Sequence, residues 1–300
     1  MKPKVSVIIP TFGRTDFLSD AIDSVFSQTF RDFELIIVDD NDPGSEWRKE
    51  TEMTIGRYQA NGRELIYVQH EKNKNGAAAR NTGFKVSSGE YISFLDSDDI
   101  YCNKRLAVAV AVMEGADEDV GGVYTGVKFR RNKRTYNVYR DTRPGNFLKE
   151  TLACRFMIGT GSNLFIRRQV LEELGGFDES FQRHQDYEFL VRFFQRYRMA
   201  ASSDVLVIKN NGNFNQPPIS RHREINRQFL KKYRSLIEVM PKADQDYIFR
   251  SNFVALGELA LREGLRRESN ELYAQASRRG RVGRRTHLRR IVFWTMSWFK

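Results

Sequence analysis

The sequence predicts an α/β fold built on a doubly wound, mixed sheet flanked by helices and followed by a helical C-terminal region. Short apolar, β-branched runs alternate with segments of helical spacing, a pattern typical of parallel strands covered on both faces. Two of the apolar runs end abruptly in aspartates. The basic excess is confined to residues 221–300, which hold 19 Lys and Arg against 8 Asp and Glu and so carry the whole net charge of +11. We therefore expect one αβ region at 1–220 and a basic helical region at 221–300.

The first two strands are expected at residues 5–10 and 33–38. The first closes at Pro10 and is followed by a turn, after which Leu18, Ile22 and Val25 recur at helical spacing. The second strand runs directly into Asp39 and Asp40. Because the carboxyl ends of parallel strands meet at one edge of the sheet, these acids should lie where open α/β sheets bind ligands.

The most informative stretch is the strand expected at residues 91–95. A third strand at 65–68 and a helix at 76–87 precede it, and it ends in Asp96, Asp98 and Asp99. Three carboxylates this close repel one another unless a cation lies among them, and Mg²⁺ or Mn²⁺ takes oxygen ligands while leaving positions for phosphates. The stretch thus predicts a metal–diphosphate site. The alternative is an acidic turn that caps a helix starting near Asn103.

The following segments alternate in a way that favours a hairpin over a crossover. A helix is expected at 106–113, a strand at 120–129, a polar turn at 130–134 and a strand at 136–139, which makes the sheet mixed. A strand at 164–166, a short helix at 169–174 and a helix that begins near Asp186 come next. Asp186 can compensate the helix dipole or do chemistry.

Five short motifs together resemble family 2 glycosyltransferases of the GT-A fold, which is Rossmann-like. They are VSVIIPT at 5–11, IIVDD at 36–40, ARNTG at 79–83, FLDSDD at 94–99, and GGFD at 175–178 followed by Gln185-Asp186. The resemblance covers roughly residues 4–210, and the chain departs from it in having Gln185 where the family commonly has Glu. It implies transfer of a sugar from a nucleotide-diphosphate donor, UDP-sugars being favoured, with inversion and with Mn²⁺ or Mg²⁺. A role in bacterial cell-surface polysaccharide or glycolipid synthesis is the matching expectation.

The resemblance also implies roles for single residues. Asp39 accepts a hydrogen bond from the nucleoside base, Asp96 reaches the ribose or the metal, and Asp98 is the metal ligand. Arg80 offers a planar fork to phosphate or to the base edge. The other residues expected to contact the nucleotide sugar are Pro10, Thr11, Phe12, Arg14 and Ser97.

Two residues are expected to act on the acceptor side or from a loop. Asp186 is the candidate general base, because a carboxylate within reach of the acceptor hydroxyl is the usual choice. His222 follows the Gly-, Asn- and Pro-rich segment 210–218, and closure of that loop could bring it to the metal. The alternative is that His222 lies on a plain surface loop.

The C-terminal region is expected to bind an anionic membrane surface. Arg-rich residues 278–290 precede the aromatic segment 291–299, and headgroup attraction plus interfacial aromatics can anchor such a tail reversibly. This predicts a cytoplasmic enzyme, peripheral on the inner face of the membrane, near a lipid-linked or saccharide acceptor. Alternatively Phe293, Trp294 and Trp298 pack on another subunit, giving a homodimer, or on the catalytic region. Only two cysteines occur, which favours a reducing compartment. We expect no signal peptide at the start of the sequence and no membrane span, since no apolar run is long enough to cross a bilayer.

Two other classes remain as alternatives. A receiver-like signalling module would also end a strand in Asp39-Asp40, but after its first strand rather than its second. A nucleotidyltransferase would also bind a metal through carboxylates. Such enzymes usually carry a Gly-rich phosphate-binding loop after the first strand, and residues 11–14 are not one. The basic tail could in either case bind nucleic acid, although no recognisable nucleic-acid-binding motif is present and we expect no such partner.

Overall fold

The computed structural model describes residues 2–13, 15–131, 133–140, 142–156, 158, 161–210 and 217–283. The chain forms two compact units. The N-terminal unit comprises Met1–Asn146 and Met157–Phe214, and the C-terminal unit comprises Phe147–Phe156 and Asn215–Lys300. The expected division at residue 220 did not assign residues 147–156 to the C-terminal part. Which functions belong to each region stays a prediction.

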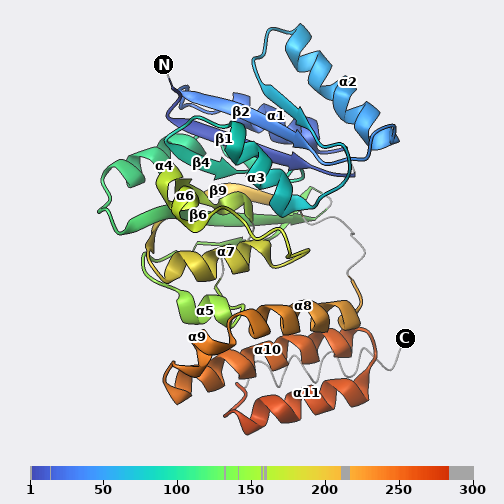
Figure 1. Ribbon diagram of the computed structural model, residues 1–300, viewed down its shortest axis with the longest axis vertical. Helices are drawn as coiled ribbons and strands as arrows, with labels where there is room; N and C mark the ends of the chain where they lie inside the picture. The colour runs from blue at the N-terminus through green and yellow to red at the C-terminus, as the bar shows by residue number, and fades with distance from the viewer. Residues whose placement is uncertain are drawn as a thin grey trace. The chain divides into compact units, whose positions relative to one another are not determined.

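The N-terminal unit is built on one mixed sheet (Figure 1), whose described strands run in the order β3-β2-β1-β4-β8-β6-β9-β5, with β7 paired to β6. β1, β2, β3 and β4 are parallel, and β8 joins the sheet antiparallel to β4. The strands are β1 (Val5–Thr11), β2 (Phe33–Asp39), β3 (Ile66–Gln69), β4 (Tyr91–Phe94), β5 (Ile100–Tyr101), β6 (Val120–Arg131), β7 (Arg134–Tyr139), β8 (Phe165–Arg167) and β9 (Arg198–Asn210). The expected α/β architecture with a doubly wound, mixed sheet is confirmed.

Strand register brings the acidic strand ends to one edge. Thr11 at the end of β1 pairs with Asp39 at the end of β2, and Ile8 of β1 pairs with Phe94 of β4. The chain that leaves β4 therefore passes the end of β1 and delivers its aspartates beside Thr11. Because of this alignment, the aspartates after β2 and those after β4 belong to one candidate site.

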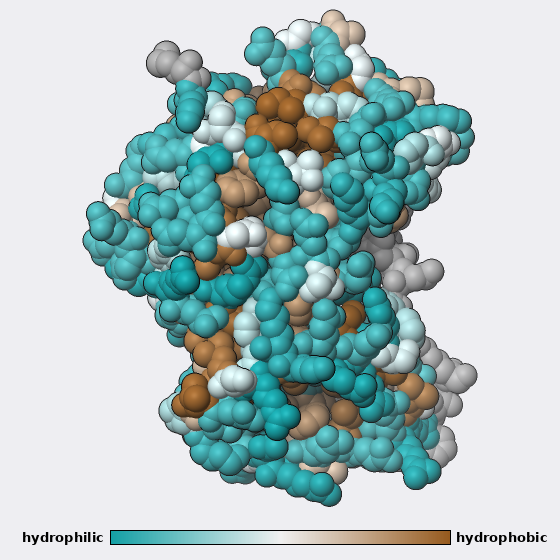
Figure 2. All heavy atoms as spheres, in the orientation of Figure 1, coloured by the Kyte–Doolittle hydropathy of each residue, from teal (hydrophilic) through white to brown (hydrophobic). Residues whose placement is uncertain are grey.

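Helices cover the sheet because their apolar residues recur on one face. In α1 (Leu18–Phe26), Leu18, Ala21, Ile22 and Val25 are fully buried, which is the spacing of a helix packed along one side. The core they join includes buried residues of β1, β2 and β4. The other helices of this unit are α2 (Glu46–Ala60), α3 (Gly76–Val86), α4 (Arg105–Glu114), α6 (Arg168–Leu174) and α7 (Gln185–Phe194), with a short 3₁₀ turn η1 (Gly161–Asn163). The face drawn in Figure 2 is covered mostly by hydrophilic side chains, as expected when the apolar residues are buried in this way.

The C-terminal unit is helical, as expected. Leu256 and Ala260 of α10 (Lys242–Arg262) pack with Leu272 of α11 (Arg266–Arg278), so these two helices form a pair. A Cβ on Gly257 would lie 3.1 Å from the Tyr273 ring, so the glycine lets the two helices approach closely. The unit contains α5 (Leu148–Leu152), α8 (Ile219–Lys232), α9 (Arg234–Glu238), α10 (Lys242–Arg262) and α11 (Arg266–Arg278).

Some elements have no clear sequence signal. α2 buries only four of its residues, two of them threonines, so its apolar periodicity is weak. β9 mixes half-buried and exposed positions and shows no clean alternation. Among the described helices, none combines the length and apolar character that crossing a bilayer requires. The aromatic tail segment 291–299 lies outside the described residues.

Candidate functional site

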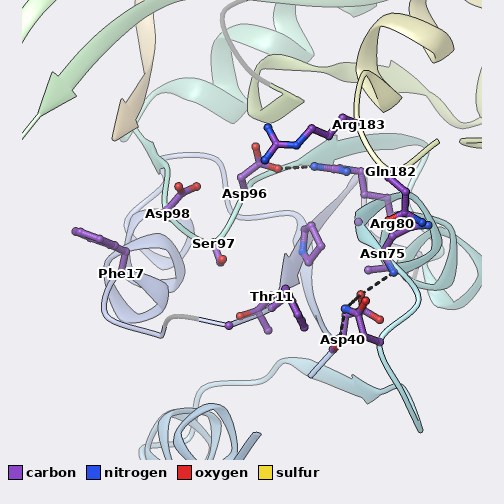
Figure 3. Close-up of a pocket in the computed structure, with 16 residues that line it drawn as sticks. Thr11, Phe17, Asp40, Asn75, Arg80, Asp96, Ser97, Asp98, Gln182 and Arg183 are labelled. Atoms are coloured by element: carbon purple, nitrogen blue, oxygen red, sulfur yellow. Dashed lines mark hydrogen bonds and ion pairs between the residues drawn. The ribbon is translucent and has the colours of Figure 1, made fainter. Parts of the chain in front are cut away.

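A cavity of about 620 Å³ lies at the carboxyl edge of the sheet (Figure 3). Its wall comes from the end of β1, the segment before α3, α3 itself, the chain after β4, and residues just before α7. The lining residues are Pro10, Thr11, Phe12, Gly13, Phe17, Asp40, Asn73, Asn75, Gly76, Ala79, Arg80, Asp96, Ser97, Asp98, Gln182 and Arg183. Segments far apart in the sequence thus form one pocket.

The acids that follow β4 crowd together at this pocket. One carboxylate oxygen from each of Asp96, Asp98 and Asp99 lies within 4.8 Å of the others. Burial, and then the neighbouring charges of Asp99 and Asp96, raise the pKa of Asp98 to about 7. Hard divalent cations prefer such oxygen ligands, and a cation would relieve the repulsion. The donor set therefore fits Mg²⁺ or Mn²⁺.

Asp99 is not among the residues that line the pocket, and it organises the backbone behind the wall. It is fully buried, it accepts a hydrogen bond from Ser162 Oγ at 2.6 Å, and it accepts another from the Asn210 amide at 3.1 Å. Ser162 Oγ in turn accepts the Asp96 amide hydrogen at 2.9 Å. Asp99 thus ties the chain after β4 to η1 and to the end of β9, while Asp96 and Asp98 face the cavity.

Lys209 supplies positive charge behind the acidic group. Its ammonium lies 3.9 Å from a carboxylate oxygen of Asp99. Burial lowers the pKa of Lys209, but the carboxylates of Asp99, Asp96, Asp98 and Asp186 outweigh that effect and raise it above its usual range. The lysine is therefore charged and partly balances the carboxylates.

Arg80 connects the acidic loop to the start of α7. One guanidinium nitrogen donates to Asp96 at 2.6 Å and the other donates to the Gln185 side chain at 3.0 Å (Figure 3 shows the contact with Asp96). The guanidinium also lies over the Phe177 ring at 5.6 Å. This link fixes the first turn of α7 relative to Asp96.

Asp39 does not line the cavity, which corrects the expectation that it meets the nucleoside base. Its side chain is fully buried, and one oxygen accepts from the backbone and side chain of Asn41. The other oxygen accepts from the Tyr67 hydroxyl at 2.6 Å and pairs with Arg48 at 3.1 Å. A buried carboxylate needs such partners, and here they leave none of it for a ligand.

Asp40 lies on the pocket wall instead and shapes the segment before α3. It accepts hydrogen bonds from the amides of Lys74 and Asn75 and from the Asn73 side chain, and it contacts His70 Nδ1 at 2.7 Å. Asn75 then caps α3 by accepting from two amides of its first turn, with a backbone φ of 109°. Asp40 therefore orders the wall that it belongs to.

The remaining expected residues are distributed as follows. Pro10, Thr11, Phe12, Ser97, Arg80, Asp96 and Asp98 line the cavity, and Phe12 is 60% exposed. Asp186 lies in the first turn of α7, half-buried, near enough for its charge to act on Lys209, but it is not part of the wall. His222 belongs to α8 of the C-terminal unit rather than to a loop, and its contact with a metal stays a prediction. Arg14 lies outside the described residues.

The sequence places Asp40 at the ligand-binding edge but gives it no role of its own, and it does not indicate the wall residues Phe17, Asn73, Asn75, Gln182 and Arg183. Part of the signal was present, because an Asn-Lys-Asn-Gly run directly before a helix is typical of a capped turn at a sheet edge. Gln182 and Arg183 precede α7 in an irregular segment that carries no periodicity.

The architecture is that of a GT-A glycosyltransferase fold. The mannosyltransferase PcManGT of Pyrobaculum calidifontis, solved with GDP-Man and Mn²⁺, is similar with a TM-score of 0.61 at 19% identity, covering 100% of this chain and 85% of that one. TarS 1-349 of S. aureus, solved with UDP-GlcNAc, has a TM-score of 0.58 at 17% identity, covering 100% of this chain and 93% of that one.

The chain belongs to glycosyl transferase family 2, whose family model matches residues 6–175. An uncharacterized glycosyltransferase of Methanocaldococcus jannaschii is 30% identical over 195 residues, 64% of each chain. The amylovoran biosynthesis glycosyltransferase AmsB of Erwinia amylovora is 29% identical over 205 residues, 62% of each chain. These matches span less than two thirds of the relatives' length. The family expected from the sequence motifs is confirmed.

Proposed function

We propose that this protein transfers a sugar from a nucleotide-diphosphate donor to an acceptor hydroxyl, with inversion at the anomeric carbon and with the help of Mn²⁺ or Mg²⁺. The observation that carries the proposal is the group of Asp96, Asp98 and Asp99 at one end of a cavity whose wall also bears Arg80. A diphosphate and a divalent ion together supply the charges that such a wall complements.

Asp98 and Asp96 are the side chains that would hold the metal. Both line the cavity, and burial followed by the charges of Asp99 and Asp96 raises the pKa of Asp98, so a cation beside it would stabilise its ionised form. When bound, the metal supplies electrostatic stabilisation to the leaving nucleoside diphosphate. Arg80 keeps Asp96 in place, and Asp99 fixes the backbone from behind.

The nucleoside would lie between the end of β1 and the segment before α3. Phe12 offers an exposed ring for stacking, and Thr11 and Asp40 stand on the same wall. We assign the strand-end contact to Asp40 in place of Asp39, since Asp40 lines the cavity and Asp39 does not.

Asp186 would act as the general base. As the acceptor oxygen bonds to the anomeric carbon, the bond from that carbon to the diphosphate oxygen breaks, and the acceptor proton passes to the Asp186 carboxylate. The Arg80–Gln185 hydrogen bond supports this role, because it holds the residue before Asp186 against the loop that carries Asp96. The side of the site nearest α7 is thereby assigned to the acceptor.

The similar proteins support the donor class and the biological setting. Solved structures with this fold hold UDP-GlcNAc in one case and GDP-Man with Mn²⁺ in another, and AmsB is named for biosynthesis of a bacterial polysaccharide. We propose the same broad donor class and a polysaccharide or glycolipid pathway for this chain.

A donor screen tests the proposal. Purified protein is titrated by calorimetry with UDP-, GDP- and dTDP-sugars, with and without Mn²⁺, and hydrolysis of each donor is followed in parallel. We expect at least one donor to bind and to be hydrolysed slowly only when the metal is present. The proposal fails if no nucleotide sugar binds under either condition.

We further propose that the basic tail holds the enzyme at an anionic membrane surface, close to a lipid-linked acceptor. Residues 278–290 contribute seven arginines, each adding about 1 kcal/mol near anionic headgroups, and the aromatic segment 291–299 favours the interface. Flotation with anionic liposomes should recover the full chain but not a chain ending at Ser277, while both turn over a soluble acceptor. A full chain that ignores anionic vesicles even at low salt rules the anchor out.

A further inference from the structure

The β6–β7 hairpin carries an unusual density of positive charge. Residues 128–140 contain six Lys and Arg, and residues 120–140 contain no Asp or Glu. Four of the six cationic side chains are exposed, and the other two, on β6, are half-buried. The six residues, called the hairpin cations below, are Lys128, Arg130, Arg131, Lys133, Arg134 and Arg140.

The hairpin cations are not neutralised within the part of the chain that the structure describes. No carboxylate there forms an ion pair with any of them, in contrast to Arg198, which pairs with Asp117 and Asp119. Arg131 and Arg134 stand directly opposite each other in the strand register, and like charges in that arrangement destabilise a hairpin. Lys133 has a left-handed backbone with φ of 61°, where Gly or Asn is favoured. The charge is therefore kept at the expense of local stability.

The hairpin begins beside the carboxylate group. In the register of β6 with β9, Phe129 pairs with Lys209 and Arg130 pairs with Asn210. The Asn210 side chain donates to the Asp98 carbonyl at 2.8 Å, and its amide donates to Asp99. The strand that carries the hairpin cations is thus joined by one residue of β9 to the backbone of the proposed metal site.

An exposed aromatic ring lies among the charges. Tyr136 is 55% exposed, its ring lies 5.7 Å from the Arg131 guanidinium, and it contacts the Phe129 ring at a centroid distance of 6.2 Å. A flat ring with a polar hydroxyl can cover the apolar face of a sugar while neighbouring cations pair with anionic groups. This combination fits a charged saccharide.

We propose that the β6–β7 hairpin binds an acceptor glycan that carries phosphate or carboxylate groups along its chain. The inference rests on the proposed glycosyl transfer and names the chemical class of its acceptor. The occupant is assigned as a glycan, rather than a lipid surface or a nucleic acid, because the hairpin cations adjoin the reaction site and surround the exposed ring of Tyr136. A growing anionic chain held there would present its terminal hydroxyl toward the cavity.

Matched pairs of glycans test the proposal. Binding of the full-length protein is measured for galacturonan oligomers against their neutral methyl esters, and for phosphorylated against unmodified maltooligosaccharides, at several salt concentrations. We expect at least one charged glycan to bind about tenfold more tightly than its neutral partner near physiological salt, with the preference falling as salt rises. The two arms distinguish carboxylate from phosphate recognition. Equal binding of charged and neutral glycans overturns the proposal.

Two triple variants with the same change in net charge locate the effect. Arg131→Gln/Lys133→Gln/Arg134→Gln should abolish the charge preference, whereas Arg57→Gln/Lys85→Gln/Lys104→Gln, which alters exposed cations elsewhere on the N-terminal unit, should keep it. Loss of the preference in both variants equally, or retention in both, contradicts the assignment.

Further measurements distinguish a glycan from other anionic partners. They also distinguish a failure of this inference from a failure of the proposed function. Phosphatidylglycerol vesicles or a DNA oligonucleotide that bind through the hairpin cations more tightly than any charged glycan overturn the choice of a glycan. Calorimetry with UDP, GDP and Mn²⁺ on the hairpin variant should match the unmodified protein. If nucleotide binds but no charged glycan is preferred, only this inference fails; if no nucleotide binds to either protein, the proposed function itself fails.

Discussion

The ends of β2 and β4 look alike in sequence and differ in chemistry. Each strand runs from buried apolar residues into aspartates at the same edge of the sheet. After β2, the carboxylates of Asp39 and Asp40 are surrounded by a guanidinium, a phenol, an imidazole and amide donors. After β4, Asp96 and Asp98 face a cavity and each other, and the pKa of Asp98 rises to about 7 because of burial and its acidic neighbours.

The comparison teaches that an acidic strand end can serve as a metal site only when the fold does not supply its carboxylates with hydrogen bonds and opposite charges. Burying a carboxylate is costly unless hydrogen bonds and opposite charges compensate it, and β2 receives that compensation from within the fold. At β4 the fold compensates Asp99 through Ser162 and Asn210, whereas burial and the charges of Asp99 and Asp96 outweigh the opposing charge of Lys209 and raise the pKa of Asp98. The Asp98 carboxylate is therefore the one available to a cation.

The largest effect is expected from Asp98→Ala, which should abolish Mn²⁺-dependent donor binding without lowering the melting temperature. Removing this carboxylate removes repulsion, since a raised carboxyl pKa means that ionisation at neutral pH works against folding. Calorimetry with donor and Mn²⁺ measures the loss of donor binding, and thermal unfolding measures the melting temperature. Donor affinity equal to that of the unmodified protein would exclude Asp98 as the metal ligand.

The opposite result is expected at β2, where Asp39→Ala should cost about 3–5 kcal/mol of unfolding free energy because it leaves the buried Arg48 guanidinium without its carboxylate. Donor affinity of the folded fraction should change little. Chemical denaturation measures the loss, and the exposed Asp32→Ala, one residue before β2, is the matched control with an effect within about 0.5 kcal/mol. A fully stable Asp39 variant with no donor binding would reverse the roles assigned to the two strand ends.

Sequence could predict the strand ends but not which side chain of each pair faces the ligand. Adjacent residues on an extended chain point in opposite directions. A shift of one residue in the strand therefore decides whether Asp39 or Asp40 faces the cavity. At β2 the structure puts Asp40 rather than Asp39 on the cavity wall, because the partners of Asp39 come from Arg48 on α2 and Tyr67 on β3. At β4 the alternation of Asp96 and Asp98 gave the right face.

Long-range contacts account for the rest of what sequence missed. The hydrogen bonds that join Asp99 to Ser162 and Asn210 span 63 and 111 residues, and no local pattern announces them. α2 was missed for a different reason, since a helix with few buried apolar residues has little periodicity to detect. Gln182 and Arg183 reach the wall from a segment whose position depends on packing around α7.

A smaller effect is expected from Asp186→Asn, which should lower transfer by about a hundredfold and leave donor affinity nearly unchanged. The charge of Asp186 acts on Lys209, as do the charges of the aspartates after β4. The variant therefore tests whether Asp186 acts together with those aspartates or as the general base for the acceptor. Donor titration and turnover are measured on the same preparation, with the exposed Glu172→Gln as control. Affinity that collapses together with rate would make Asp186 a donor contact or a structural residue.

The smallest effect is expected from Asp99→Asn, and it separates positioning from coordination within the β4 group. Asparagine keeps an oxygen that can accept from the Ser162 hydroxyl or from the Asn210 amide. It loses the negative charge that strengthens both hydrogen bonds and that attracts Lys209. We expect a loss of about 1–2 kcal/mol in unfolding free energy and a fall of no more than about tenfold in Mn²⁺-dependent donor affinity. Paramagnetic titration with Mn²⁺ alone distinguishes the two roles, because a positioning residue lowers the affinity modestly whereas a ligand lowers it as far as Asp98→Ala does. If the two variants lose Mn²⁺ binding equally, Asp99 is a ligand and the burial that separates it from the cavity must open when the metal enters.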